Sequence, residues 1–180
     1  MRVGLFGGSF DPPHLGHIMV AAYALSVGQF DEVWVLPCWH HAFGKEMEAF
    51  GHRVEMAQLA FGIFGGRVRV CEYERDFKTR HTVDLVQRLR ETMPAPEYTL
   101  ILGSDNQQET QRWHRWEELS RMLPILWVPR GSEADPSFFI AGVSSTQVRQ
   151  AFRDGKPEVA QSLLPPAVFK HIQDNTLYQD

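Results

Sequence analysis

The segment from Gly7 to His17 reads GGSFDPPHLGH and concentrates residues suited to chemistry. Its two adjacent glycines, Gly7 and Gly8, allow the backbone to turn tightly and to approach a ligand closely. His14 and His17 are three residues apart where a helix is expected to begin, so both rings can project to one side. The first turn of a helix offers N–H groups and the positive end of the helix dipole, which favour an anion. The segment therefore predicts a phosphate-binding site.

Other interpretations of this segment stay open. It matches neither GxGxxG nor the P-loop pattern GxxxxGK[ST], so the standard dinucleotide and P-loop interpretations fail. Two histidines three apart could form half of a metal site, but the glutamate of the HExxH pattern is missing and no third ligand stands out. A glycine turn with two solvated histidines is the plainest alternative. We favour phosphate binding and expect no metal-ligating residues.

A second segment, Val143–Arg149, supports an anion site. It reads VSSTQVR and places the hydroxyls of Ser144 and Ser145 at an expected helix start, with Arg149 about one turn in. Hydroxyls, helix N–H groups and a guanidinium fork all suit phosphate oxygens. The alternative is an ordinary N-cap followed by a surface arginine, and this segment alone does not decide between the two.

Short apolar runs alternate with segments of helical periodicity along the whole chain. Strands are expected at Arg2–Gly7, Val33–Pro37, Val68–Tyr73, Tyr98–Leu102 and Ile125–Val128. Helices are expected at Leu15–Val27, His52–Phe64, Thr82–Met93, Ser144–Arg153 and Pro166–Gln173. This alternation predicts an α/β fold, a doubly wound, Rossmann-like five-stranded parallel sheet with helices on both faces.

Two longer connections follow strands directly, at Cys38–Gly51 and Arg130–Gly142. The carboxyl ends of parallel strands lie at one edge of a sheet, where such folds bind ligands. Long loops at that edge are typical of substrate contact or of a lid.

The two chemistry-bearing segments together resemble the (H/T)xGH nucleotidylyltransferase superfamily, and within it the bacterial nicotinate-nucleotide adenylyltransferases. The resemblance runs nearly end to end. Three further blocks carry it: His52–Met56 is similar to an HRxxM block, Leu102–Asp105 to LGxD, and Trp113–Leu119 to a tryptophan block.

The resemblance implies adenylyl transfer from ATP to nicotinate mononucleotide, with release of pyrophosphate, Mg²⁺ accompanying the ATP and no covalent intermediate. It implies catalytic roles for His14, His17 and Arg149. The ATP-binding residues that it implies are Gly7, Gly8, Ser9, Phe10, His14, His17, Gly103, Asp105, Ser144, Ser145 and Arg149. Such a transfer needs positioning and charge stabilisation rather than a nucleophile–base pair.

The acceptor side departs from the family pattern. Where a PPHK-type stretch is usual, the chain has Pro37–Lys45, and Lys45 can keep the basic role. Where SYTx(D/E)T is usual, it has Arg80–Asp84, and Thr82 can still bind a carboxylate at a helix start. Trp113 is expected to stack on the pyridine ring.

Several residues on the acceptor side keep a second interpretation. Cys38, His40 and His41 could instead suggest a metal, although adjacent histidines rarely serve one site. Trp39 and Phe43 suit either loop packing or a lid over the ring. Trp127 and Cys71 are expected in the core.

Composition bounds the class of protein. The chain has 180 residues, a formal net charge of −4 and two cysteines, which do not make a disulfide framework. Its length favours one domain over residues 1–180. Mild acidity gives no overall attraction for nucleic acid or acidic membranes, so a local positive cluster must hold an anion.

Neither a secretory signal nor an apolar run of the roughly 20 residues that cross a bilayer is visible. We therefore expect a cytoplasmic protein whose partners are ATP and a pyridine mononucleotide, with a homo-oligomer left open. Two alternatives remain: the same transfer to nicotinamide mononucleotide or another phosphate-bearing acceptor, and a non-catalytic nucleotide-binding regulator.

Overall fold

The computed structural model describes residues 1–40, 44, 46–129 and 142–179. It confirms the predicted α/β fold. The five strands are all parallel and lie in the order β3-β2-β1-β4-β5. They are β1 (Arg2–Gly8), β2 (Glu32–Pro37), β3 (Val68–Val70), β4 (Glu97–Gly103) and β5 (Ile125–Val128).

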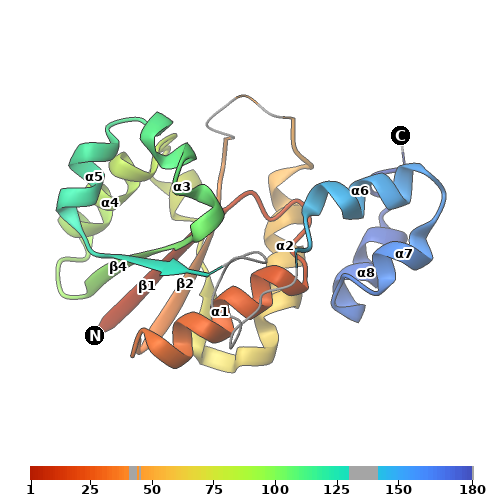
Figure 1. Ribbon diagram of the computed structural model, residues 1–180, viewed down its shortest axis with the longest axis horizontal. Coiled ribbons are helices and arrows are strands. Elements are labelled where there is room, and N and C mark those ends of the chain that lie inside the picture. Colours follow the sequence, from red (N-terminus) through yellow and green to blue (C-terminus); the bar gives the residue numbers. More distant parts are fainter. Residues whose placement is uncertain (41–43, 45, 130–141, 180) are drawn as a thin grey trace.

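Helices connect the strands and follow the last one (Figure 1). They are α1 (Leu15–Val27), α2 (Phe50–Phe61), α3 (Tyr73–Asp76), α4 (Thr82–Thr92), α5 (Trp116–Met122), α6 (Ser145–Arg153), α7 (Pro157–Gln161) and α8 (Pro166–Asp174). Three 3₁₀ turns, η1 (Gly62–Arg67), η2 (Ser104–Asn106) and η3 (Glu109–Arg112), complete the described elements. In the described ranges, no helix has both the length and the apolar character to cross a membrane.

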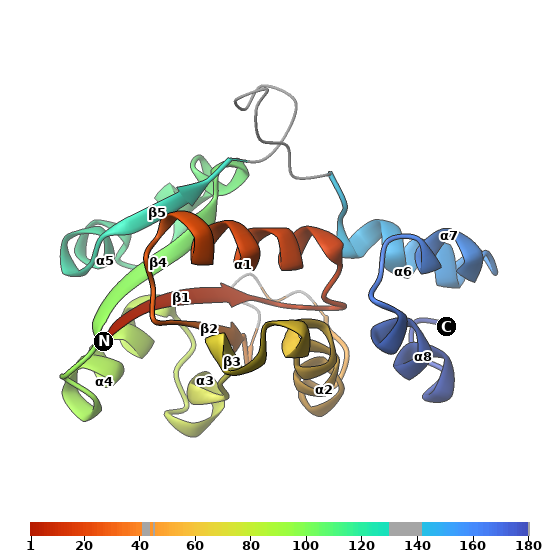
Figure 2. The same ribbon diagram turned by 90° about the horizontal axis from the view of Figure 1, so that it is seen from below.

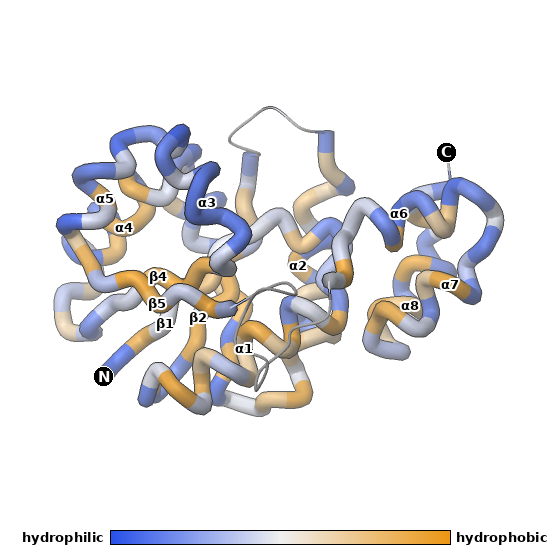
Figure 3. The backbone as a smooth tube through the Cα atoms, viewed as in Figure 1, coloured by the Kyte–Doolittle hydropathy of each residue, from blue (hydrophilic) through white to orange (hydrophobic). Residues whose placement is uncertain are grey.

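The sheet buries an apolar layer on each face, because successive strand side chains point to opposite sides. Val3 and Leu5 of β1 join the layer formed with α4 and α5, whereas Phe6 joins the layer formed with α1, α2, α6 and α8. The strands accordingly form a hydrophobic centre, and hydrophilic residues concentrate on outer turns (Figure 3). Cys71 is buried in the α4–α5 layer, as predicted, whereas Trp127 is half-buried against it rather than fully in the core.

The expected elements differ from the structure mainly at their ends. The α-helix predicted to Phe64 ends at Phe61 and continues as the 3₁₀ turn η1, in which Gly65 has a φ of +57°. The strand predicted to run from Val68 to Tyr73 was too long: β3 ends at Val70, and Tyr73 begins α3. The short helices α3, α5 and α7 were not predicted, because so few residues leave little periodicity to detect.

The strand order reverses between β1 and β4, which is where doubly wound folds open a crevice at the carboxyl ends. Leu5 pairs with Leu100, so Gly8 and Gly103, each three residues farther along, reach the same edge. Helices α6, α7 and α8 gather beyond this edge, past the start of α1 (Figure 2). The fold therefore brings the β1–α1 junction, the end of β4 and the C-terminal helices to one place.

Candidate active site

The junction between β1 and α1 turns at Phe10 rather than at a glycine. Neither Gly7 nor Gly8 has a positive φ, whereas Phe10 has a φ of +47°, which a non-glycine residue rarely adopts. Gly8 is required for a different reason, since a Cβ there would lie 3.1 Å from the Phe10 ring. A Cβ at Gly7 would meet nothing within 4 Å, so the backbone there is open to a close ligand approach. Buried packing of Phe10 against Phe61, at 5.8 Å between ring centroids, holds the turn.

His14 and His17 lie together at the start of α1, as their spacing predicted. Their rings stack at 3.8 Å between centroids, His14 is buried and forms the N-cap, and His17 is half-buried. The His14 backbone N–H donates to Nδ1 of His17 at 3.1 Å. A ring nitrogen that accepts carries no proton, so the neutral His17 ring holds its proton on Nε2. Nε2 is therefore the atom with which His17 can donate to an anion.

The start of α6 contacts the same junction. Ser145 Oγ donates to the backbone oxygen of Pro12 at 2.9 Å. The buried guanidinium of Arg149 donates through Nη1 to the Asp11 backbone oxygen and lies 3.5 Å from Asp11 Oδ2. The two segments that the sequence singled out therefore converge in space, through contacts between residues 133 and 138 positions apart.

Asp11 is the buried residue that joins these segments. Only 1% of it is exposed, and its Oδ1 accepts from the hydroxyl of Tyr178 at 2.9 Å and from the backbone N–H of Glu48 at 3.3 Å. Burial, together with the Asp11 carboxylate, raises the pKa of the Tyr178 hydroxyl, which therefore stays a donor. Asp11 thus ties the β1–α1 turn to α6, to the C-terminus and to the start of α2.

Arg53 fixes the other side of the turn. It is 1% exposed, and its guanidinium donates to three backbone oxygens: Ser9 at 2.7 Å, Cys38 at 2.8 Å and Glu48 at 2.9 Å. A buried cation is tolerated when its donors are satisfied in this way. The HRxxM block of the sequence therefore holds the exits of β1 and β2 against the start of α2.

A buried carboxyl group on α3, that of Glu74, contacts the segment that follows β2. Glu74 Oε2 accepts the backbone N–H of Trp39 at 3.0 Å, and burial raises the pKa of Glu74 to about 7. Burial also raises the pKa of the nearby Cys38 thiol to about 11. A metal-binding cysteine must lose its proton, so this environment disfavours Cys38 as a ligand. His41, Phe43 and Lys45 lie outside the described residues.

The two expected acceptor-binding segments lie side by side. Thr82 is half-buried at the first position of α4, directly after His81. The His81 ring stacks on His114 at 4.3 Å between centroids, and Arg115 forms an ion pair with Asp84 at 3.1 Å. The start of α4 and the segment after Trp113 are thus joined by a ring stack and an ion pair.

Trp113 packs against more apolar side chains than its neighbours in the sequence indicated. It is half-buried, packs against the α4–α5 layer and meets Trp116 edge-to-face at 5.9 Å between centroids. It also borders a hollow of about 600 Å³. A role against a ring and a role in packing are both compatible with this position.

The remaining expected ATP contacts lie at two places, the end of β4 and the start of α6. Gly103 is buried at the end of β4, and Asp105 is exposed on η2 just beyond it. Ser144 is the N-cap of α6, where its Oγ accepts from the Gln147 N–H at 3.3 Å. Ser144 therefore caps α6, and its expected ATP contact stays a prediction, whereas Ser145 reaches across to the β1–α1 turn.

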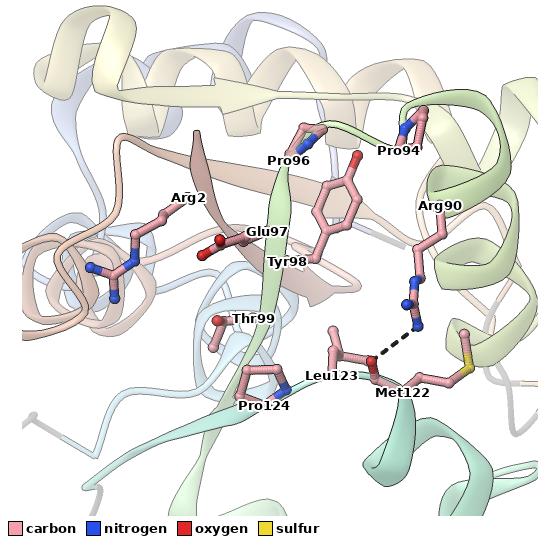
Figure 4. A pocket seen from close by; sticks show the side chains of 10 residues that line it. All are labelled: Arg2, Arg90, Pro94, Pro96, Glu97, Tyr98, Thr99, Met122, Leu123 and Pro124. Atoms are coloured by element: carbon pink, nitrogen blue, oxygen red, sulfur yellow. Dashed lines mark hydrogen bonds between the residues drawn. The ribbon is translucent and has the colours of Figure 1, made fainter.

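A cavity of about 580 Å³ lies away from this site (Figure 4). It surrounds the first residues of β4, and Arg90 on its wall donates to the backbone oxygen of Met122 at 3.1 Å. Since β4 begins there and ends at Gly103, this cavity is at the opposite edge of the sheet from His14 and His17.

Sequence reasoning missed several residues that build the site. Asp11 and Arg53 stood inside the quoted motifs without a role, and Tyr178 and Glu74 were not considered. A charged residue inside a motif was the available signal for both Asp11 and Arg53. Tyr178 gave no such signal, because its partner lies 167 residues away.

Comparison with known proteins places the chain in a family. A family described as cytidylyltransferase-like matches residues 5–151. A protein of Myxococcus xanthus (strain DK1622), named probable nicotinate-nucleotide adenylyltransferase, is 35% identical over 184 residues, which cover 99% of this chain and 95% of that protein. The chain belongs to the nicotinate-nucleotide adenylyltransferase family.

Other nicotinate-nucleotide adenylyltransferases are similar to the chain over nearly its whole length. The Bacillus subtilis (strain 168) protein of that name is 30% identical, with 99% of this chain and 98% of that protein covered. The Plasmodium falciparum nicotinic acid mononucleotide adenylyltransferase, solved in complex with NaAD, superposes with a TM-score of 0.84 over 98% of this chain and 97% of that one. At 22% identity, the structural likeness supports the fold.

Proposed function

We infer that the chain adenylylates nicotinate mononucleotide with ATP in NAD biosynthesis, and that the β1–α1 turn and the start of α6 together hold the triphosphate. The contact of Ser145 and Arg149 with Pro12 and Asp11 is the observation that supports this placement most strongly. This contact places the start of α1, with the imidazoles of His14 and His17, next to the start of α6, with the guanidinium of Arg149. An acidic chain needs such a local cluster to hold a polyanion.

The reaction joins two phosphates. An oxygen of the mononucleotide phosphate forms a bond to the α-phosphorus of ATP, the bond from that phosphorus to the bridging oxygen breaks, and pyrophosphate leaves with the electron pair. Negative charge develops on the α-phosphate and on the leaving group. In our proposal, His17 donates its Nε2 proton in a hydrogen bond to this charge, and His14 and Arg149 stabilise it from either side.

We propose that ATP enters as its Mg²⁺ complex. The oxygens of Asp11, the carboxylate at the centre of the turn, are already engaged by Tyr178, Arg149 and the Glu48 N–H. Mg²⁺ usually keeps several waters and binds substrate phosphates with few protein ligands. The donor set at the turn therefore fits an ion that the triphosphate carries, neutralising part of its charge, better than an ion in a protein cage.

The acceptor ring is proposed to lie between the start of α4 and Trp113. The N–H groups at Thr82 suit a nicotinate carboxylate, whereas a carboxamide would require a paired donor and acceptor. His81 stands where the family usually has tyrosine and stacks on His114, so it shapes this side of the pocket in the present chain. Lys45 stays an expected acceptor contact.

We propose that the protein works in the cytoplasm. Cys38 and Cys71 are both free thiols, as expected where thiols stay reduced. The homo-oligomer and the single domain over residues 1–180 both stay predictions.

A pyrophosphate-release assay of the purified chain tests the proposed function. It uses ATP, Mg²⁺ and, in separate reactions, nicotinate mononucleotide and nicotinamide mononucleotide. We expect fast pyrophosphate release with nicotinate mononucleotide. With nicotinamide mononucleotide, we expect at most slow release. Faster release with the amide would change the acceptor, and ATP binding without release with either mononucleotide would favour the non-catalytic nucleotide-binding regulator.

A further inference from the structure

Three side chains between α2 and α8 form a cluster that the proposed reaction does not use. His52 and Glu55 lie three residues apart on α2, and His171 lies on α8. One ligand atom from each of the three lies within 4.8 Å of the other two, and they are the one such group among the described residues. His171 is buried, His52 is half-buried and Glu55 is exposed, so the cluster opens to solvent on one side.

The two imidazoles face each other with nitrogens at a metal-ligand spacing. Nδ1 of His52 lies 3.2 Å from Nε2 of His171. Two nitrogens bound to one tetrahedral Zn²⁺ at about 2.0–2.1 Å lie about 3.3 Å apart. Without a metal, one of the two nitrogens must carry the proton that they share. A divalent ion can replace that proton when the two rings turn so that both lone pairs point at the ion, with little change in the distance between the nitrogens.

Glu55 supplies the third donor. Its Oε1 lies 3.4 Å from Nδ1 of His171, beside the ring rather than between the two rings. The side chain is 61% exposed, so a rotation that brings the carboxylate to the metal costs little packing. Its i, i+3 spacing from His52 on one helix places both side chains on the same face. Paired imidazoles with a carboxylate suit Zn²⁺ and its neighbours in the transition series, with the remaining positions open to water.

We propose that His52, Glu55 and His171 bind a divalent transition-metal ion of the Zn²⁺ class, which fastens α8 to α2. Both helices lead to the phosphate-binding turn. Arg53, next to His52, donates to Ser9, and the chain after α8 carries Tyr178, which donates to Asp11. The ion is therefore a structural bridge outside the reacting atoms, and it holds together two supports of that turn.

Titration of the full chain with Co²⁺ as a spectroscopic probe, followed by displacement with Zn²⁺, tests the site. We expect one Co²⁺ per chain with a visible absorption band typical of a protein-bound ion. His52→Gln and Glu55→Gln are expected to weaken Co²⁺ binding at least about tenfold. The matched controls, His114→Gln and Glu91→Gln, replace residues outside the cluster and should leave the affinity unchanged.

Thermal unfolding gives a second readout that does not depend on turnover. Added Zn²⁺ should raise the melting temperature of wild type, because an ion that binds only the folded state stabilises it. At the same Zn²⁺ concentration the rise should be smaller for Glu55→Gln, whose exposed side chain can be changed without disturbing the fold. Equal Co²⁺ affinity in wild type and His52→Gln, or no binding by wild type, would overturn the proposal.

Discussion

At the scale of single residues, hydrogen bonds at the β1–α1 turn fix the proton position on His17 and the orientation of Arg149. The His14 backbone N–H occupies Nδ1 of His17, so only Nε2 of the neutral ring carries a proton. His17 is therefore fixed as a hydrogen-bond donor by the backbone N–H of His14. Arg149 has its position fixed in the same way by Asp11.

Replacing His17 tests this assignment. Loss of one preorganised donor typically costs roughly 10²–10³ in rate, and we expect at least about 10² in kcat for His17→Ala. The pyrophosphate-release rate at saturating ATP and nicotinate mononucleotide measures it. The melting temperature of the same variant shows whether the fold survives. Near-normal turnover would remove His17 from the mechanism.

Glu74 is a residue whose charge depends on pH. Burial raises its pKa from 4.5 to about 7. A carboxyl group with a raised pKa binds its proton more tightly in the folded state, so its contribution to stability is full below about pH 4.5 and is lost as the pH rises through about 7. Glu74→Gln keeps an acceptor for the Trp39 N–H and removes the titration.

We therefore expect Glu74→Gln to be more stable than wild type at about pH 8 and nearly equal to it at about pH 5. The free energy of unfolding in urea at both pH values measures the difference. Glu91→Gln, which changes an exposed helical glutamate, is the control and should show no such pH dependence. An equal effect of Glu74→Gln at both pH values would contradict a titration in this range.

At the scale of elements, Ser144 caps α6, the helix that carries Arg149. The hydroxyl of Ser144 accepts from the Gln147 N–H, and the Gln147 side chain accepts in return from the Ser144 N–H at 3.0 Å. This reciprocal pair is a capping box, which satisfies two backbone donors at the helix start. The predicted helix start at Ser144 is therefore explained by the residue that caps it.

Ser144→Ala should lower the free energy of unfolding by about 1 kcal/mol, the usual cost of a lost N-cap. Urea unfolding of the variant measures this change. Ser120→Ala is the matched control, because Ser120 lies inside α5 and its hydroxyl donates to the Glu117 backbone oxygen without capping a helix. A loss no greater than that of Ser120→Ala would mean that the capping box contributes little to α6.

At the scale of the whole molecule, the two ends of the chain meet at Asp11. The Tyr178 hydroxyl donates to its carboxylate across 167 positions of sequence, and Arg149 donates to the same residue from α6. The C-terminal helices are thereby attached to the turn that holds the triphosphate in our proposal.

Tyr178→Phe removes one hydrogen bond to a buried carboxylate, which typically contributes about 1.5–3 kcal/mol. We expect stability to fall by that amount, and kcat/KM for ATP to fall with it. Tyr98→Phe is the control: Tyr98 donates to the backbone oxygen of Met93 at 2.9 Å, at the opposite end of the sheet. If both variants lose the same activity, the contact with Asp11 has no role beyond stability.

The sequence by itself determined the strands, the longer helices and the two segments on which our phosphate-binding proposal rests, because periodicity, glycine and capping residues act over a few neighbouring positions. Helix α1 and strand β5 begin and end where they were predicted. Strand β3 is shorter than predicted, because its length depends on pairing with β2 rather than on its own residues.

Only the tertiary structure decided which residues hold the site together. It assigned Phe10, not a glycine, to the left-handed turn, and it brought Arg53, Tyr178 and Arg149 to backbone and carboxylate oxygens far away in sequence. It also placed His171 against His52. These contacts depend on the order of the strands and the packing of helices from opposite ends of the chain, and no local pattern of side chains records either.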